Sequence, residues 1–309
     1  MRNILLGAIG IVTGCLILII NSNAVADYVS LNKRYLAIKK YLDQSQFETP
    51  IYIHSSLSKQ SLKGEVYGLI HNPDITFEQL EKAFANYKNW CEFIPLHLNV
   101  KACIYQRINK RRYLTFYVGR KFYQAPEDVY RVRYRFRLVT MTKGYFNVVL
   151  NAPYGPAGTS NYLLQLEVMK VEDKILFRVI SSYTPSRRSR FGTSIYLSTK
   201  GKDKTGFTVV GVGNDGKPVY VRGIKGIIER NVIRYFLAGK AFMATRKLPY
   251  DKRYKALLQY WFLETEKYHK QLYEMSKKQY LKAKLHERQN QLELQEKYNQ
   301  KTGITSKRK

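Results

Sequence analysis

The feature that most constrains the fold is a segment in which basic and apolar side chains alternate. Arginine stands at every odd position, and an aliphatic or aromatic residue stands at every even one: Arg131, Arg133, Arg135 and Arg137 against Val132, Tyr134, Phe136 and Leu138. Successive side chains of a β-strand point to opposite faces of a sheet. Residues 129–140 are therefore predicted to form a strand with one buried face and one basic face.

Short segments with the same period of two recur along much of the chain. Turn residues separate them, and they comprise residues 51–53, 63–70, 100–106, 113–119, 129–140, 145–150, 161–168, 175–183, 193–198, 206–212 and 218–222. Many short strands at close spacing favour an antiparallel meander over a parallel sheet.

Apolar residues three and four positions apart predict helices on both sides of these strands. One helix covers residues 28–42, and another starts at Thr76, where Gln79 completes a capping-box pattern. A long amphipathic helix follows the strands over residues 223–245, and a further helical region runs over residues 253–298. The second half of that region is mostly Lys, Glu and Gln, which is typical of a solvated helix.

These elements predict an α+β fold in which a curved antiparallel sheet surrounds the long helix. Its apolar face is rich in Tyr and Phe, and either side chains or a cavity must fill the space beneath the helix. The predicted organisation is a signal peptide, an N-terminal helical segment, the main domain, a basic helical extension and a disordered basic tail: residues 1–26, 27–48, 49–246, 247–298 and 299–309.

The N-terminus indicates export. Arg2 precedes an apolar run over residues 4–20, and Ala24 and Ala26 flank a small-x-small cleavage pattern. This order predicts a periplasmic or otherwise exported protein. An uncleaved inner-membrane anchor is an alternative, because the run would span about 25 Å as a helix. A lipidated Cys15 is a third possibility.

Two cysteines remain after removal of the signal, Cys91 and Cys103. An even count in an oxidising compartment makes a disulfide plausible. Two buried thiols that pack as small apolar side chains are the alternative.

The charge balance favours anionic partners. The chain has 53 Lys and Arg against 23 Asp and Glu, a formal net charge of +30. For an exported protein, the nearest anionic surface is a membrane, and the four arginines of residues 131–137 and the basic C-terminal helix are predicted to face it. Solubility alone is the alternative explanation for part of this charge.

Several familiar motifs are absent or misplaced. Residues 211–216 spell GxGxxG, but a strand pattern follows instead of a helix, so a hairpin turn is predicted there. The five histidines are scattered without metal-ligand spacing, and no nucleophile motif occurs. We therefore predict no metal, no cofactor and no catalytic residues.

One polar group on the long helix is a candidate site. Arg230 and Arg234 are four residues apart, share a helical face and are placed to hold one anionic group, with Glu229 as a structural partner. Ion pairs from Glu229 and Arg230 to the rim of the sheet are the alternative.

The order of elements and several local phrases resemble the START-like (SRPBCC) helix-grip superfamily. Residues 76–95 are similar to its entry helices and end in the phrase W-x-x-F-x-P at residues 90–95. Phrases at residues 99–103, 155–159, 204–207 and 229–231 are similar to an uncharacterised group of exported proteobacterial proteins. The resemblance implies that residues 223–245 form the helix held by the sheet and that a hydrophobic ligand binds between them.

The leading hypothesis is an exported carrier for a lipid-like ligand. The candidate ligand-binding residues are Trp90, Tyr105, Phe116, Tyr134, Phe136, Arg230, Asn231 and Arg234. A hydrolase or lyase that uses Glu229 in the same cavity is one alternative. A nucleic-acid-binding module, indicated by the alternation of Arg and aromatic residues, is another, although export argues against nucleic acid as a partner. The sequence leaves the oligomeric state open.

Overall fold

The computed structural model describes residues 25–45, 47–71, 74–198 and 202–303. The predicted signal peptide lies outside these residues except for Val25 and Ala26, as does the alternative membrane anchor at residues 4–20. Within the described part of the chain, no helix has both the length and the apolar character needed to cross a bilayer.

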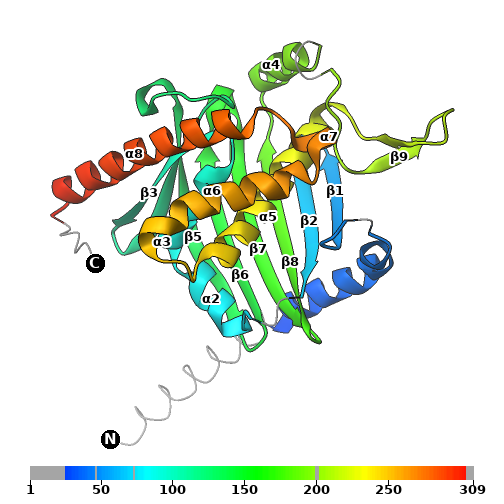
Figure 1. The fold of residues 1–309 in the computed structure, drawn as a ribbon, viewed down its shortest axis with the longest axis horizontal. Coiled ribbons are helices and arrows are strands. Elements are labelled where there is room, and N and C mark those ends of the chain that lie inside the picture. The colour runs from blue at the N-terminus through cyan, green and yellow to red at the C-terminus, as the bar shows by residue number, and fades with distance from the viewer. Residues whose placement is uncertain (1–24, 46, 72–73, 199–201, 304–309) are drawn as a thin grey trace, which may run out of the picture.

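An antiparallel sheet of eight strands forms the body of the protein (Figure 1). The strands are β1 (Ile51–Leu57), β2 (Leu62–Ile70), β3 (Val100–Ile108), β4 (Arg111–Val118), β5 (Tyr130–Thr142), β6 (Tyr145–Tyr154), β7 (Ser160–Val171) and β8 (Lys174–Thr184). Their spatial order is β1-β2-β8-β7-β6-β5-β4-β3, so the N-terminal hairpin pairs with the last strand of the meander. The predicted antiparallel meander and the α+β fold class are confirmed.

Strand β5 has the predicted two faces. Val132, Tyr134 and Phe136 are buried in the main core, and the four arginines between and beside them are exposed. Pairing of Tyr134 with Leu114 on β4 and of Phe136 with Leu150 on β6 keeps the apolar side chains of three strands on one face. A shift of one residue would turn the arginines into the core, which fixes the register.

The prediction is wrong for residues 193–198, which belong to helix α4 (Arg187–Ser198). Ser186 and Ser189 explain the helix start, because the backbone N–H of each donates to the hydroxyl of the other at 3.0 Å. Reciprocal capping of this kind satisfies backbone donors that a helix leaves unpaired at its start.

Two further predicted strands form, but outside the main sheet. β9 (Val209–Val212) and β10 (Pro218–Tyr220) pair only with each other. The predicted turn joins them, with Gly216 donating to the carbonyl of Gly213 at 2.9 Å.

The entry helices are α2 (Phe77–Ala85) and α3 (Tyr87–Phe93), and a short 3-10 turn over Ile94–Leu96 follows them. The capping box between Thr76 and Gln79 is present, as predicted. Asn86 separates the two helices and caps the second, since its side chain accepts from the backbone N–H of Lys88 at 3.1 Å.

The long helix α5 (Gly223–Thr245) lies on the concave face of the sheet and packs on β1, β2 and β8. Two glycines of β2 permit this close approach. A Cβ atom at Gly68 would lie 2.3 Å from the ring of Phe236, and one at Gly64 would lie 3.0 Å from Ile228. The helix therefore sits over one side of the sheet.

The C-terminal helical region is interrupted rather than continuous. It consists of α6 (Tyr250–Glu266), the single turn α7 (His269–Leu272) and α8 (Lys277–Lys301), which starts at a capping box between Ser276 and Gln279. Helix α6 covers α5, and Trp261 of α6 is part of the main core (Figure 1). Residues 304–309, most of the predicted disordered tail, lie outside the described residues, and α8 extends to Lys301.

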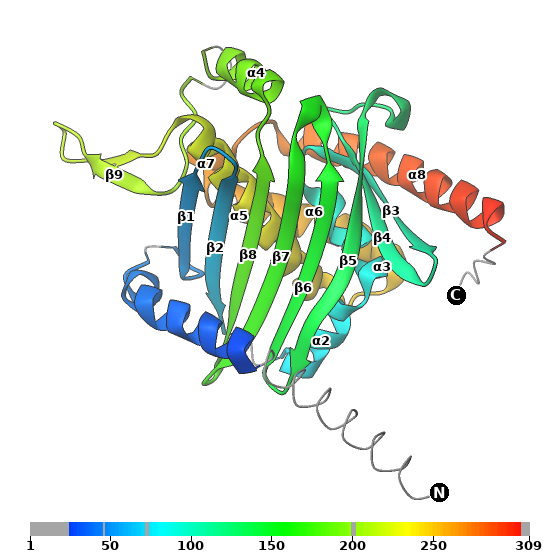
Figure 2. The same cartoon turned by 180° about the vertical axis from the view of Figure 1, so that it is seen from behind.

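A helix over residues 25–43 covers part of the opposite, convex face of the sheet (Figure 2). Leu31, Tyr35 and Leu42 from this helix form a second core with Tyr145 and Met169 from the sheet. The apolar residues whose spacing predicted this helix are thus the ones that pack against the sheet.

Helix α8 is not the solvated helix that its composition predicts. It runs along β3, the edge strand of the sheet, and contacts it through polar side chains. Gln291 accepts from the backbone N–H of Cys103 and donates to the carbonyl of Cys91, both at 2.9 Å. Gln295 accepts from the backbone N–H of Tyr105 at 2.9 Å and donates to the carbonyl of the same residue at 3.1 Å. These amides satisfy groups that an edge strand would otherwise expose.

We predict that Gln291→Ala lowers the free energy of unfolding by about 1–3 kcal/mol, because it leaves a buried N–H of β3 without an acceptor. Gln289→Ala is the matched control, since Gln289 is exposed and bonds only Glu293 on the same helix. Urea unfolding of both variants measures the difference. Equal effects at the two positions would contradict the polar docking of α8.

Cys91 of α3 and Cys103 of β3 are joined by a disulfide, with their Cα atoms 4.9 Å apart. In a Cys15→Ser chain, we expect no reactive thiol in the denatured, unreduced protein and two after reduction. Titration with a thiol reagent measures both states. Two thiols before reduction would show that the pair is not bonded.

Candidate functional site

A cavity of about 470 Å³ lies between α5 and the sheet. Residues of β4, β5, β7 and β8 form one side of it, and residues 227–235 of α5 form the other. Residues Pro156 and Ala157 of the β6–β7 connection and residues 188–193 of α4 border it as well. Its volume is within the range of about 300–1,000 Å³ that is usual for small-molecule sites.

Aromatic rings in contact with one another form the wall on the sheet side. Phe116 and Tyr134 have ring centroids 4.6 Å apart, Tyr134 and Tyr162 are at 6.3 Å, and Tyr162 and Tyr183 are stacked at 5.3 Å. Burial raises the pKa of Tyr183 to about 12 and that of Tyr134 well above its usual value. These hydroxyls are therefore protonated at neutral pH and give the apolar wall neutral polar groups.

Basic side chains form another part of the lining. Lys121, Arg230 and Arg234 border the cavity, and we call them the cationic group. Glu274 lies 2.5 Å from Lys121 and 3.1 Å from Arg234, and Lys204 shares the same carboxylate at 3.8 Å. Burial lowers the pKa of Lys121 to about 8, and repulsion from Arg234 adds to this effect despite the contact with Glu274. Basic side chains and the carboxylate of Glu274 thus stand together beside the cavity.

His97 contributes a buried donor next to this group. Its Nδ1 accepts from the backbone N–H of Asn99 at 3.1 Å, which places the proton of the neutral ring on Nε2. Among the described residues, Nε2 has no hydrogen-bond partner, although the side chain is 2% exposed and borders the cavity. Burial and then the charge of Arg234 hold the pKa of His97 well below its usual value. The ring is therefore neutral.

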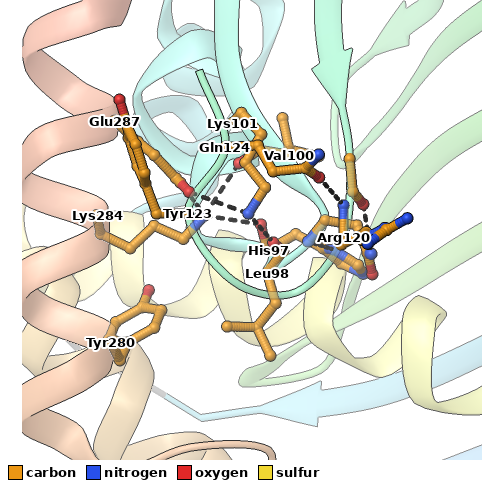
Figure 3. Close-up of polar contacts among 12 residues, drawn as sticks. His97, Leu98, Val100, Lys101, Arg120, Tyr123, Gln124, Tyr280, Lys284 and Glu287 are labelled. Carbon is orange, nitrogen blue, oxygen red and sulfur yellow. Dashed lines mark hydrogen bonds and ion pairs between the residues drawn. The ribbon is translucent and has the colours of Figure 1, made fainter. Parts of the chain in front are cut away.

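A buried ion cluster holds the segment that carries His97 (Figure 3). Nζ of Lys284 on α8 donates to the carbonyls of His97 and Val100 at 3.0 and 2.9 Å and to Glu287 at 2.7 Å. Glu287 also accepts from Lys101 at 3.0 Å. Helix α8 thus connects the edge of the sheet to one side of the cavity.

The structure brings five of the eight predicted ligand-binding residues to the cavity: Phe116, Tyr134, Arg230, Asn231 and Arg234. It places Trp90 and Phe136 in the packed core, with ring centroids 5.9 Å apart, and the indole N–H of Trp90 donates to the carbonyl of Phe84. The gap beside Trp90 has a volume of only about 20 Å³. Tyr105 borders a separate surface groove with Tyr87.

Glu229 has a structural role, because within the described residues its carboxylate accepts from neutral donors instead of forming the alternative ion pair with the sheet rim. Its carboxylate accepts from the hydroxyls of Ser55 and Thr208 at 2.6 and 2.8 Å and from the backbone N–H groups of Phe207 and Thr208 at 2.7 and 3.0 Å. A Cβ atom at Gly206 would lie 2.5 Å from this carboxylate, so glycine is required there. Glu229 is not among the residues that line the cavity.

The sequence reasoning did not find His97, Lys121 or Tyr162. His97 and Lys121 come from turns on either side of the β3–β4 hairpin, and neither stands in a repeated pattern. Tyr162 lies in the predicted strand 161–168, next to the phrase at residues 155–159, but neither feature singles out its side chain. Within the described residues, no group of three or more His, Cys, Asp and Glu side chains is arranged to hold a metal.

Comparison with known proteins gave matches only among solved structures: no protein-family model and no curated protein matches the chain. A truncated norcoclaurine synthase from Thalictrum flavum is 11% identical, with a TM-score of 0.28 over 50% of this chain and 89% of that chain. CalU16 from Micromonospora echinospora is 8% identical, with a TM-score of 0.25 over 64% and 98%. Similarity this low carries no information on ligand or activity. The helix-grip arrangement rests on the strand order and the placement of α5 in this chain.

We predict that Lys284→Met destabilises the protein by about 3–5 kcal/mol, because it breaks a buried ion pair and removes a charged donor from two backbone carbonyls. Lys282→Met, at an exposed position of the same helix, is the control and should change stability by less than about 0.5 kcal/mol. Thermal and urea unfolding measure both. A small effect at position 284 would contradict the assigned cluster.

Proposed function

We propose that this protein is an exported binding or carrier protein for an amphiphile with an apolar tail and an acidic head group. The observation that carries the proposal is a cavity lined by an aromatic wall, by the cationic group and by His97, whose buried Nε2 has no hydrogen-bond partner among the described residues. An apolar tail fits the wall formed by Phe116 and Tyr134. A carboxylate or phosphate head is an acceptor for the buried donor and a counter-charge for the cations.

Two properties of the sequence support an envelope ligand. The N-terminal pattern of residues 1–26 predicts export, and phrases of the chain resemble an uncharacterised group of exported proteobacterial proteins. The net charge of +30 favours work at an anionic membrane, and the exposed arginines of β5 are one candidate surface for it.

The two alternative functions have weaker support. Glu229, the only acid–base candidate for a hydrolase or lyase, has both oxygens occupied by neutral donors away from the cavity. Nucleic-acid binding through β5 would need exposed aromatic rings among the arginines, but Tyr134 and Phe136 are buried on the opposite face, and Tyr117, which pairs with Arg131, is 6% exposed.

The direct test is calorimetric titration of delipidated protein with oleate, with methyl oleate as the head-group control. We expect oleate to bind and its neutral ester to bind at least about 10-fold more weakly, a difference of about 1.4 kcal/mol. Lys121→Met should weaken oleate binding and leave methyl oleate unchanged, whereas Lys143→Met, at an exposed position, should change neither. Equal affinity for the two ligands would contradict recognition of the head group.

The pH dependence follows from the lowered pKa of Lys121, about 8. Lys121 is cationic below this value and neutral above it, so affinity for an anion should fall as pH rises through 8. Hexadecanesulfonate is a suitable probe, because its own charge is constant over this range. A bound anion favours the protonated form of Lys121 and so raises its pKa in the complex. The midpoint for loss of the ligand should therefore lie at a somewhat higher pH than the pKa of Lys121 in the free protein.

In Lys121→Met, this fall in affinity between pH 7 and pH 9 should be absent. Fluorescence competition over that range measures it. A profile that is unchanged in the variant would show that Lys121 does not face the head group.

A further inference from the structure

The β9–β10 hairpin exposes an unusual amount of apolar surface. Val209, Val210, Val212 and Val219 are 53%, 60%, 72% and 43% exposed, so valines face solvent on a ribbon that has no third strand. A two-stranded hairpin is marginally stable on its own in water, and contiguous exposed apolar groups mark interaction sites.

Other exposed apolar side chains lie at the same end of the molecule. Figures 1 and 2 both show α4 beyond the ends of the strands and the hairpin extending sideways past β1 near that same end. Phe191 of α4 is 71% exposed, and Tyr154 at the end of β6 is 79% exposed. The hydroxyl of Ser186, just before α4, donates to the carbonyl of Ala157 at 2.6 Å, which holds α4 beside the β6–β7 connection.

These elements have an excess of basic residues. Residues 185–198 and 202–225, which contain α4 and the hairpin, have eight Lys and Arg against two Asp. Protruding apolar side chains among basic ones are the pattern of a protein that lies on an anionic membrane, where the apolar groups enter the interface and the cations meet the head groups.

We propose that α4, the β9–β10 hairpin and Tyr154 form a docking surface for an anionic lipid bilayer. This proposal goes beyond ligand binding and does not depend on an occupant in the cavity. Arg188 and Gly192 of α4 border the cavity, so docking on this surface would bring the cavity next to the bilayer.

This surface is better suited to a bilayer than the arginines of β5. Between residues 131 and 137, the apolar side chains face the core and only the arginines are exposed. This segment offers mainly electrostatic attraction, which salt screens, and the exposed apolar side chains Val139 and Met141 of β5 lie beyond it. The docking surface offers both charge and apolar groups that penetrate the interface.

Tryptophan quenching by brominated lipids tests which surface meets the bilayer. The native Trp90 and Trp261 are each 2% exposed and give a constant background. Three variants of the full chain each carry one new probe: Val212→Trp on the hairpin, Val139→Trp on β5 and Leu292→Trp on α8. All three positions are exposed in the structure. The vesicles contain equal amounts of phosphatidylglycerol and phosphatidylcholine with brominated acyl chains.

We expect strong quenching of the probe at position 212 and little at positions 139 and 292. The N-terminal residues are identical in all variants, so a tether through them would not produce this difference. Quenching at 139 or 292 without quenching at 212 would overturn the proposal and assign the bilayer to β5 or to α8. No quenching at any position would overturn it as well.

A second measurement uses loss of apolar groups. In vesicle sedimentation, Phe191→Ser with Val210→Ser should lower partitioning onto anionic vesicles about 10-fold or more relative to Leu285→Ser with Leu292→Ser on α8. Neutral vesicles should bind both proteins weakly. Equal partitioning of the two variants would contradict the docking surface. Oleate titration of the same variants distinguishes the docking surface from the proposed ligand binding. A loss of vesicle partitioning with unchanged oleate affinity concerns the docking surface alone.

Discussion

The close contact between α5 and strand β2 determines much of the remaining structure. The glycines at positions 64 and 68 let the helix backbone and Phe236 approach the sheet where any other residue would collide. Because α5 packs over β1, β2 and β8, it leaves space on the side of β4 and β5. The packed core around Trp90 and the cavity beside Tyr134 are two consequences of this off-centre position.

Part of the cavity lining consists of buried charged side chains, whose burial lowers the stability of the fold unless they are paired. Here the carboxylate of Glu274 contacts Lys121, Lys204 and Arg234. Beside the aromatic wall, His97 adds a buried Nε2 that has no hydrogen-bond partner among the described residues. Local departures from optimal stability are expected at functional sites, and the acidic amphiphile that we propose as ligand has a head group that can interact with these polar groups.

Helix α8 links the sheet edge to this site. Its glutamines occupy the hydrogen-bonding groups of β3, and Lys284 and Glu287 fix the turn that presents His97. The C-terminal region therefore acts as part of the main domain rather than as a separate extension. The remaining distinctive elements, α4 and the β9–β10 hairpin, contribute little to the core and carry exposed apolar and basic groups, which is consistent with a role at a surface.

The sequence by itself determined the elements whose side chains repeat with a period: the eight strands of the sheet, α5, and the capped start of α2. It also placed Arg230 and Arg234 on one face, because four residues make about one helical turn. Tertiary structure alone decided which aromatic residues line a cavity, since Tyr134 and Phe136 have the same strand face and differ only in what α3 and α5 place above them. It also decided the role of α8 and of His97, because hydrogen bonds between distant polar side chains leave no periodic signal in a sequence.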